Sequence, residues 1–185
     1  MGLSDKEIID GCIKGDREAQ KILYSQFSGQ MYMVCLRYAR EQQEAEDILQ
    51  EAFIKVYDAI KNFRGESKLV YWIKRIVINT ALNSQRSKLY LYPMVDVDEL
   101  KEYPDDAISV SDFTMDELLE MIKKLPTGCQ VIFNLYAIEG FKHQEIAKML
   151  KITEGTSKSQ YARAKALLQE QMFRAVPDLE RRKNS

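Results

Sequence analysis

Residues 125–170 read LPTGCQVIFNLYAIEGFKHQEIAKMLKITEGTSKSQYARAKALLQE, and this stretch decides the fold of the C-terminal part of the chain. A Thr-x-x-Gln capping box at Thr127 predicts the start of a helix, which Gly140 can end in a left-handed cap. Apolar residues at helical spacing predict a short helix over residues 143–150, and after a tight turn Thr153 can cap a longer helix. The pattern predicts a helix-turn-helix preceded by a supporting helix.

The last helix of this stretch has a packing side and an opposite face of small, polar and basic residues. The packing side contains Ser157, Tyr161, Ala164 and Leu168. The opposite face and flank carry Gly155, Lys158, Ser159, Ala162, Arg163 and Lys165. A helix of this kind can enter a DNA major groove, so the stretch predicts DNA binding. The alternative is that the basic side chains only form a solvated surface.

The composition argues against catalytic, metal and membrane chemistry. No apolar run approaches the roughly 20 residues that a membrane span needs. The polar start, with a capping box from Ser4 to Glu7, does not resemble a signal peptide, so we expect a cytoplasmic protein without membrane insertion. With His143 as the single histidine, a zinc cluster or a histidine-based triad lacks its residues, and we expect no cofactor, no metal and no enzyme activity.

The three cysteines are far apart in the sequence and odd in number. Cys12, Cys35 and Cys129 lie among apolar residues of expected helices. This pattern favours buried free thiols over a disulfide or a metal site.

Charge is unevenly distributed, although the net charge is only −1. Residues 61–90 carry 7 basic and 1 acidic side chains, and residues 121–185 carry 12 and 6. Residues 91–120, between them, carry 1 basic and 10 acidic side chains. Two basic segments separated by an acidic one predict two surfaces that face nucleic acid and a solvated connector that joins them.

The rest of the chain also shows helical periodicity, and no segment has the period of a strand. Capping residues and breakers predict helices over residues 4–15, 16–40 with a break at Ser28-Gly29, 43–62, 67–87 and 113–125. Residues 91–111 lack an amphipathic face and are expected to be a flexible acidic linker. The tail after Val176 is expected to fray.

The helix over residues 43–62 carries two aromatic residues, Phe53 and Tyr57, away from the centre of its apolar stripe. They can be anchors of a docking surface beside the carboxylates of this helix, or they can be core residues. Periodicity alone favours the core.

The loop that starts at Phe63 and the helix after it combine aromatic, basic and amide side chains. Arg64 and Tyr71 are the strongest candidates for binding phosphate and unstacked bases, whereas Trp72 is expected in the core. The alternative is a core tryptophan with ordinary solvated lysines.

Five pieces of the sequence together resemble a bacterial extracytoplasmic-function sigma factor, in the minimal two-domain branch of the sigma-70 family. Their order and spacing over about 120 residues are more specific than any one motif. The pieces are Ala45 to Phe53, Phe63 to Ser67, Trp72 to Ile76 with Asn79, Leu125-Pro126, and Gly155 to Ser159 with Arg163 to Lys165.

The resemblance implies an all-α fold with two small helical domains joined by an acidic flexible linker. Residues 1–90 would be sigma region 2, residues 91–111 the linker, and residues 112–185 sigma region 4. The implied partners are core RNA polymerase, through its β′ clamp helices and β flap, promoter DNA and an anti-sigma factor.

The resemblance also implies three sets of site residues. The polymerase-binding set is Asp47, Gln50, Glu51, Phe53 and Tyr57, which moves the two aromatic residues from the core toward the interface. The set that melts and reads the minus-10 element is Phe63, Arg64, Tyr71, Lys74, Arg75, Asn79, Asn83 and Arg86. The set that reads the minus-35 element is Thr156, Lys158, Ser159, Ala162, Arg163 and Lys165.

The sequence departs from the family pattern at several positions. Ser157 and Gln160 stand where valine and arginine are common, which suggests one phosphate-binding charge fewer. Asn83 stands where aspartate is frequent, so the promoter sequence does not follow from the resemblance.

Two other classes of function stay open beside the sigma factor. An autonomous helix-turn-helix regulator would bind duplex DNA without polymerase. A small helical enzyme would need converging acid, base or metal-binding residues, and the sequence shows none.

Overall fold

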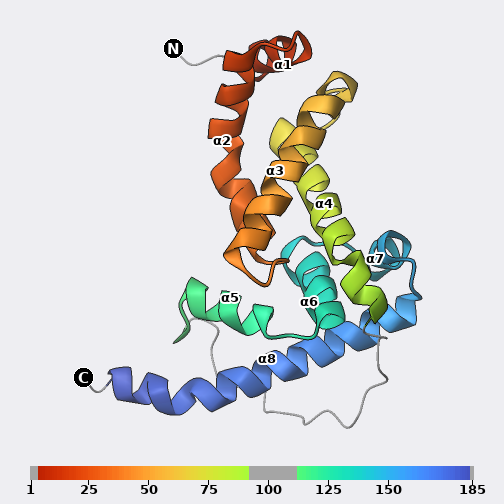
Figure 1. Cartoon of the computed structure of the whole chain (residues 1–185). Helices are drawn as coiled ribbons and strands as arrows, with labels where there is room; N and C mark the ends of the chain where they lie inside the picture. Colours follow the sequence, from red (N-terminus) through yellow and green to blue (C-terminus); the bar gives the residue numbers. More distant parts are fainter. Residues whose placement is uncertain (1–3, 92–111, 184–185) are drawn as a thin grey trace. The chain divides into compact units, whose positions relative to one another are not determined.

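The computed structural model of the chain describes residues 4–91 and 112–183, and all of their regular elements are helices (Figure 1). The chain divides into two compact units, Met1–Arg86 and Ser87–Ser185, and each is described here by itself. The predicted all-α fold with two helical domains is confirmed. The expected linker lies outside the described residues, except for Leu91, the last residue of a helix.

The first unit begins with two capped helices, α1 (Asp5–Ile13) and α2 (Arg17–Leu36). The predicted capping box from Ser4 to Glu7 is present, and Asp16 caps α2 by accepting the backbone N–H of Glu18 at 2.9 Å. The break predicted at Ser28-Gly29 is wrong, because α2 continues through both residues. Buried residues on either side of the glycine hold the helix against its neighbours, and this burial outweighs the cost of about 1 kcal/mol for a helical glycine.

The first unit continues with α3 (Gln42–Ala59), a 3-10 turn (Ile60–Asn62) and α4 (Leu69–Leu91). In Figure 1, α3 and α4 run side by side. The core of the unit is formed by fully buried side chains from three helices, chiefly Leu23, Met31, Ile48, Ala52, Val56, Ile73 and Val77. This core leaves one face of α3 and one face of α4 open to partners.

Helices α1 and α2 cross closely at Gly11. A Cβ atom at this position would lie only 2.5 Å from the Cβ of Ala19 on α2, a distance at which two carbon atoms overlap. The absence of a side chain at Gly11 therefore sets how near α1 can approach α2.

The second unit comprises α5 (Met115–Lys123), α6 (Thr127–Phe133), the π-helical turn η3 (Asn134–Ile138), α7 (His143–Leu150) and α8 (Glu154–Lys183). The capping box predicted at Thr127 is wrong. Pro126 is the N-cap residue of α6, and Thr127 is buried inside the first turn. The fraying predicted after Val176 is also wrong, because α8 continues to Lys183.

Two residues in the left-handed conformation shape the helix-turn-helix. Gly140 has the predicted positive φ, 79°, and follows the π-helical turn. Lys151 ends α7 with φ 57° and ψ 46°, and its backbone N–H donates to the carbonyl of Ala147. The tight turn between α7 and α8 therefore depends on a lysine in a conformation that favours glycine.

Replacing Lys151 by glycine should raise the free energy of unfolding of the second unit by up to about 1 kcal/mol, because the strain of a side chain at positive φ disappears. Thermal unfolding followed by circular dichroism measures this change. The matched control is Lys148→Gly, an exposed position within α7, which should lower stability by about 1 kcal/mol. Equal destabilisation by both changes would contradict the argument.

The core of the second unit joins α6 to α8 through Leu125, Cys129 and Ala164, with Phe133 and Leu167 packed against them. All three cysteines of the chain are free and buried, as predicted. Burial raises the pKa of the Cys35 thiol to about 12 and also raises the pKa of Cys129. These thiols are therefore neutral packing groups.

Candidate functional site

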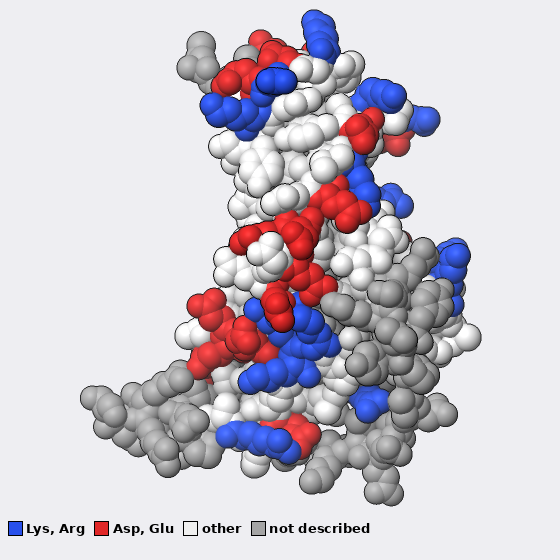
Figure 2. All heavy atoms as spheres, in the orientation of Figure 1, with Lys and Arg blue, Asp and Glu red and all other residues white. Residues whose placement is uncertain are grey.

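Helix α3 has an exposed face on which Asp47, Gln50 and Glu51 are open to solvent. In Figure 2, acidic side chains follow α3 along the visible face of the first unit. Ile54 lies on the same face, at i+7 from Asp47 and i+4 from Gln50, and 61% of its surface is exposed. A large apolar side chain with an acidic and amide rim is typical of a protein-docking surface.

Phe53 and Tyr57, the two aromatic residues predicted to contact polymerase, are both at least half-buried in the structure. Phe53 is only 2% exposed and packs edge-on against Tyr24, with 4.7 Å between the ring centroids. Its ring is therefore a core group, as periodicity alone favours. This burial corrects the interface position that the resemblance implies for Phe53. Tyr57 is half-buried and its hydroxyl donates to the carbonyl of Gln20 at 3.1 Å. Burial raises its pKa to about 12, so the hydroxyl stays protonated.

Ile54 is a residue that the sequence reasoning missed. The signal was available, because Ile54 is an isoleucine on a line that is otherwise polar, one position after Phe53. The aromatic residues drew attention instead, since their size makes them common interface anchors.

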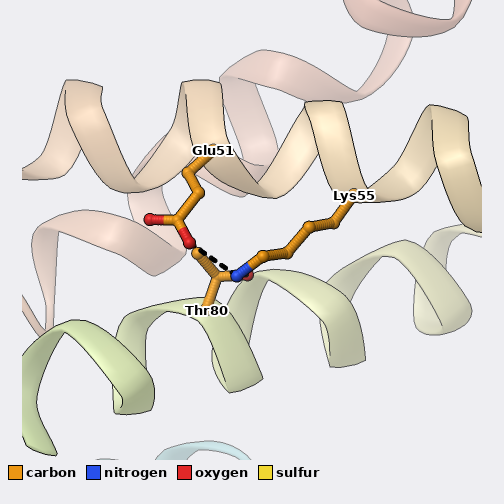
Figure 3. Close-up of polar contacts among 3 residues, drawn as sticks. All are labelled: Glu51, Lys55 and Thr80. Carbon is orange, nitrogen blue, oxygen red and sulfur yellow. Dashed lines mark hydrogen bonds and ion pairs between the residues drawn. The ribbon is translucent and has the colours of Figure 1, made fainter.

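Glu51 and Lys55 link α3 to α4 (Figure 3). The Lys55 Nζ atom lies 2.6 Å from Glu51 Oε1 and 3.4 Å from the hydroxyl oxygen of the buried Thr80 on α4. Glu51 therefore already holds a cation of its own chain, and a charge change at Glu51 also disturbs the contact between the two helices.

The loop before α4 covers a pocket of about 370 Å³. Phe63 lines this pocket and packs edge-on against Trp72, with 5.4 Å between the ring centroids. Trp72 is half-buried rather than fully in the core. Gln26, Phe27 and Lys68 also line the pocket, whereas Arg64 is exposed and pairs with Glu66 at 3.9 Å.

The outer face of α4 carries a row of exposed side chains at intervals of four residues: Tyr71, Arg75, Asn79 and Asn83. Tyr71 is 61% exposed, and the row extends for about 18 Å at 1.5 Å per residue. An aromatic ring, a cation and two amides in one row suit the bases and phosphates of a single strand. Lys74 is half-buried beside the row, and the Arg86 side chain lies outside the described residues.

The outer face of α8 carries small residues along its centre and basic residues along its edges. Lys158, Ala162 and Lys165 are exposed, whereas Thr156, Ser159 and Arg163 are half-buried. On a helical projection, Lys158 and Lys165 lie on one side of Gly155 and Ala162, and Arg163 lies on the other. The Nζ atom of Lys158 is 2.7 Å from Glu154 Oε1, and this contact lowers the pKa of Glu154.

Two of the departures from the family pattern, Ser157 and Gln160, are buried on the inner side of α8. The Ser157 hydroxyl lies 2.9 Å from His143 Nδ1, and Gln160 Oε1 accepts the S–H of Cys129 at 3.1 Å. A residue at position 160 therefore faces α6, and the suggestion that Gln160 removes a phosphate-binding charge is wrong.

A groove of about 650 Å³ lies between the turn after α5 and the middle of α8. Leu125, Pro126 and Leu167 supply apolar groups to it. Lys124, Arg163 and Arg174 add positive charge, and Glu170 adds one negative charge. The groove can therefore accept an apolar segment that also carries acidic side chains.

No helix in the described ranges, 4–91 and 112–183, is both long enough and apolar enough to cross a membrane.

Both units match known protein families. Residues 23–89 match the family described as Sigma-70 region 2, and residues 115–168 match the family described as Sigma-70, region 4. The RNA polymerase sigma-H factor of Pseudomonas aeruginosa is 30% identical over 173 residues, which cover 87% of this chain and 90% of that protein. The ECF RNA polymerase sigma-E factor of Escherichia coli is 29% identical over 175 residues, which cover 88% and 91%.

A solved structure shares the fold. It is the sigma factor RpoE in complex with the anti-sigma factor NepR from Bartonella quintana, and it covers 81% of this chain and 94% of its own, with a TM-score of 0.52 and 19% identity. The family matches and the nearly full-length relatives agree with each other. The chain therefore belongs to the sigma-70 family, as an alternative sigma factor of the extracytoplasmic-function branch that directs transcription by RNA polymerase.

Proposed function

We propose that residues 1–90 act as sigma region 2, which binds polymerase and the minus-10 element, and that residues 112–185 act as sigma region 4, which reads the minus-35 element. The main support for this assignment is that α3 and α4, in the same unit, each have an exposed face. The face of α3 suits a protein, and the row on α4 suits a nucleic-acid strand.

The polymerase contact is the face of α3 formed by Asp47, Gln50, Glu51 and Ile54, with Tyr57 at its edge. Ile54 takes the anchoring role that the prediction gave to Phe53, because Ile54 is exposed and Phe53 is not. The acidic rim suits basic side chains on the β′ clamp helices, and rim charges of this kind mainly speed association.

The minus-10 contact combines the loop at Phe63 with the row on α4. Unstacking a base costs a few kcal/mol, and stacking on an aromatic ring returns about 1–3 kcal/mol per base. Tyr71 offers such a ring, and the half-open pocket under the loop offers space for the extruded base. Arg75 and Arg64 then hold phosphates, while Asn79 and Asn83 offer amides to base edges.

The minus-35 contact is the outer face of α8. Its small centre, Gly155 and Ala162, lets the helix backbone approach the base edges closely. Lys158 and Lys165 on one edge and Arg163 on the other can then reach the phosphates of the two strands that border the groove.

The groove beside α8 is the proposed site for the β flap of core polymerase. Its apolar residues and its net positive charge support this assignment. Such a contact would hold the second unit on polymerase while its α8 reads DNA.

An anti-sigma factor is a further proposed partner. The exposed Ile54 and the basic face of α8 are surfaces that such a partner would cover, because polymerase and DNA need both. Competition between the anti-sigma factor and core polymerase for the purified chain would measure this, and simultaneous binding of both would argue against it.

Run-off transcription with purified core polymerase tests the proposed function. We expect transcripts from a promoter library that core polymerase alone does not produce. Tight footprinting of duplex DNA without polymerase, together with no initiation in its presence, would instead support an autonomous regulator.

Replacing Ala162 by glutamate should reduce transcription from promoters that depend on a minus-35 element by about tenfold, because the carboxylate would face base edges and phosphates. Run-off transcription on matched promoters measures the change. Ala137→Glu, at an exposed alanine outside α8, is the matched control and should have little effect. The same loss on a promoter whose minus-35 element has been scrambled would contradict the assignment.

A further inference from the structure

A buried amide joins α4 to the start of α3. Gln85 lies on α4 and is 1% exposed. Its Nε2 group donates to the backbone carbonyl of Tyr38 at 3.0 Å and to Glu44 Oε1 at 2.9 Å. Both neighbouring atoms are acceptors, so the amide has to present its N–H₂ group to them.

Glu44 extends this contact into the connection between α2 and α3. Its second oxygen, Oε2, accepts the backbone N–H of Arg40 at 2.8 Å. Tyr38 is buried and lies just after the end of α2, and Glu44 lies in the first turn of α3. Gln85 therefore contacts the end of one helix and the beginning of the next, and it does so without a buried charge of its own.

Gln85 lies close to the proposed DNA-facing row of α4. Gln85 is two residues after Asn83, the last side chain of the exposed row on α4. A second polar contact between α3 and α4 joins Lys55 to Thr80 (Figure 3). Glu44 and Lys55 are 11 residues apart on α3, or about 16 Å.

Two polar contacts about 16 Å apart constrain both the angle and the axial position of α4 against α3, together with the apolar core between the helices. Apolar side chains packed between two helices favour a crossing angle by interlocking, but their contacts have no preferred direction from atom to atom. Hydrogen bonds to fixed backbone and carboxylate oxygens do have a directional preference.

We propose that Gln85 is a positioning residue for promoter melting: its buried amide sets the register between the polymerase-binding face of α3 and the DNA-facing row of α4. Polymerase holds α3, and the melted strand lies along α4. The register between the two helices thus determines whether the row on α4 lies beside the melted strand when polymerase is bound to α3. This inference rests on the proposed function of the first unit.

The test uses the full chain with Gln85→Met, which keeps the length of the side chain and removes both N–H donors. We expect opening of a duplex promoter, measured by permanganate reactivity of unpaired thymines, to fall about tenfold. Polymerase affinity should be unchanged, and transcription from a promoter that is already melted at minus-10 should equal that of the wild type. Gln30→Met, at an exposed glutamine on α2, is the matched control and should open the duplex normally.

A second variant separates positioning from general loss of stability. In Gln85→Glu the ionised side chain would face the carboxylate of Glu44 and the carbonyl of Tyr38, with Arg40 nearby. When it is protonated it can donate one hydrogen bond. Duplex opening by this variant, relative to the wild type at the same pH, should therefore rise as the pH falls.

Three results would overturn the inference. Normal duplex opening by Gln85→Met would show that the amide does not position α4. An equal loss on the melted promoter, or a loss of polymerase affinity, would show that Gln85 only stabilises the unit. If the wild-type chain itself neither bound polymerase nor initiated, the proposed function would fail and this inference with it.

Discussion

Replacing Ile54 by aspartate is expected to lower the affinity of the chain for core polymerase by about 30-fold or more, which corresponds to about 2 kcal/mol. Ile54 is the large apolar side chain on the open face of α3, and a partner that covers it removes it from water. Aspartate would remove the apolar anchor and would bury a charge at the centre of the contact, where desolvation of the carboxylate is costly. Titration of core polymerase with fluorescently labelled protein measures the affinity directly.

The control for this prediction is Ile13→Asp. Ile13 lies on α1, is 51% exposed and is outside the proposed contact. Both variants should unfold at the temperature of the wild type, because neither side chain is in the core. Equal polymerase affinity for Ile54→Asp and Ile13→Asp would remove Ile54 from the interface.

Replacing Gly11 by alanine is expected to lower the free energy of unfolding of the first unit by about 1–3 kcal/mol, which is the usual cost of an overpacked contact. The new Cβ atom would overlap the Cβ of Ala19, and both atoms are bonded directly to helix backbones, so neither can turn away as a flexible side chain could. Urea unfolding followed by circular dichroism measures the change.

Gly29→Ala is the matched control, and its effect on the free energy of unfolding should have the opposite sign. Gly29 also lies within a helix, but no atom lies within 4 Å of the position of its Cβ. Alanine there should stabilise the unit by about 0.5–1 kcal/mol, because it only improves helix propensity. If both glycines responded alike, close packing of α1 on α2 would not be the cause.

Sequence reasoning predicted best those features that depend on neighbours in the chain. The caps at Ser4, Asp16 and Thr153 and the left-handed Gly140 are present as expected. In each case, the partner of the side chain or the preferred backbone conformation is determined within a few residues. The helix-turn-helix was predictable for the same reason.

Features that depend on packing between distant segments were less predictable. The continuity of α2 through Gly29 comes from buried residues that contact other helices, which outweigh the local preference for a break. The buried place of Thr127 at the start of α6 is likewise set by contacts outside its own turn. A periodicity pattern cannot weigh such contacts.

In the candidate site, too, some features follow from local sequence and others depend on contacts between distant segments. The four residues of the exposed row on α4 belong to the larger minus-10 set that the resemblance implies, and helical spacing brings these four onto one face. The burial of Phe53 agrees with its periodicity, which favoured the core, whereas the resemblance placed it at the interface. The exposed Ile54 was not named from the sequence. The contacts of Gln85 likewise join residues more than 40 positions apart, so no local pattern indicates them.

The ion pair between Lys158 and Glu154 affects how ionic strength acts on DNA binding. A lysine that neutralises a phosphate normally releases a condensed cation from the DNA, and this release makes binding sensitive to salt. Lys158 already has an anion one turn away, at 2.7 Å. When Lys158 turns to a phosphate, Glu154 loses its partner and can take up a cation from solution. The gain in counterion entropy from that contact is then largely cancelled. In the proposed minus-35 contact, α8 therefore meets DNA with less electrostatic attraction than its lysines suggest.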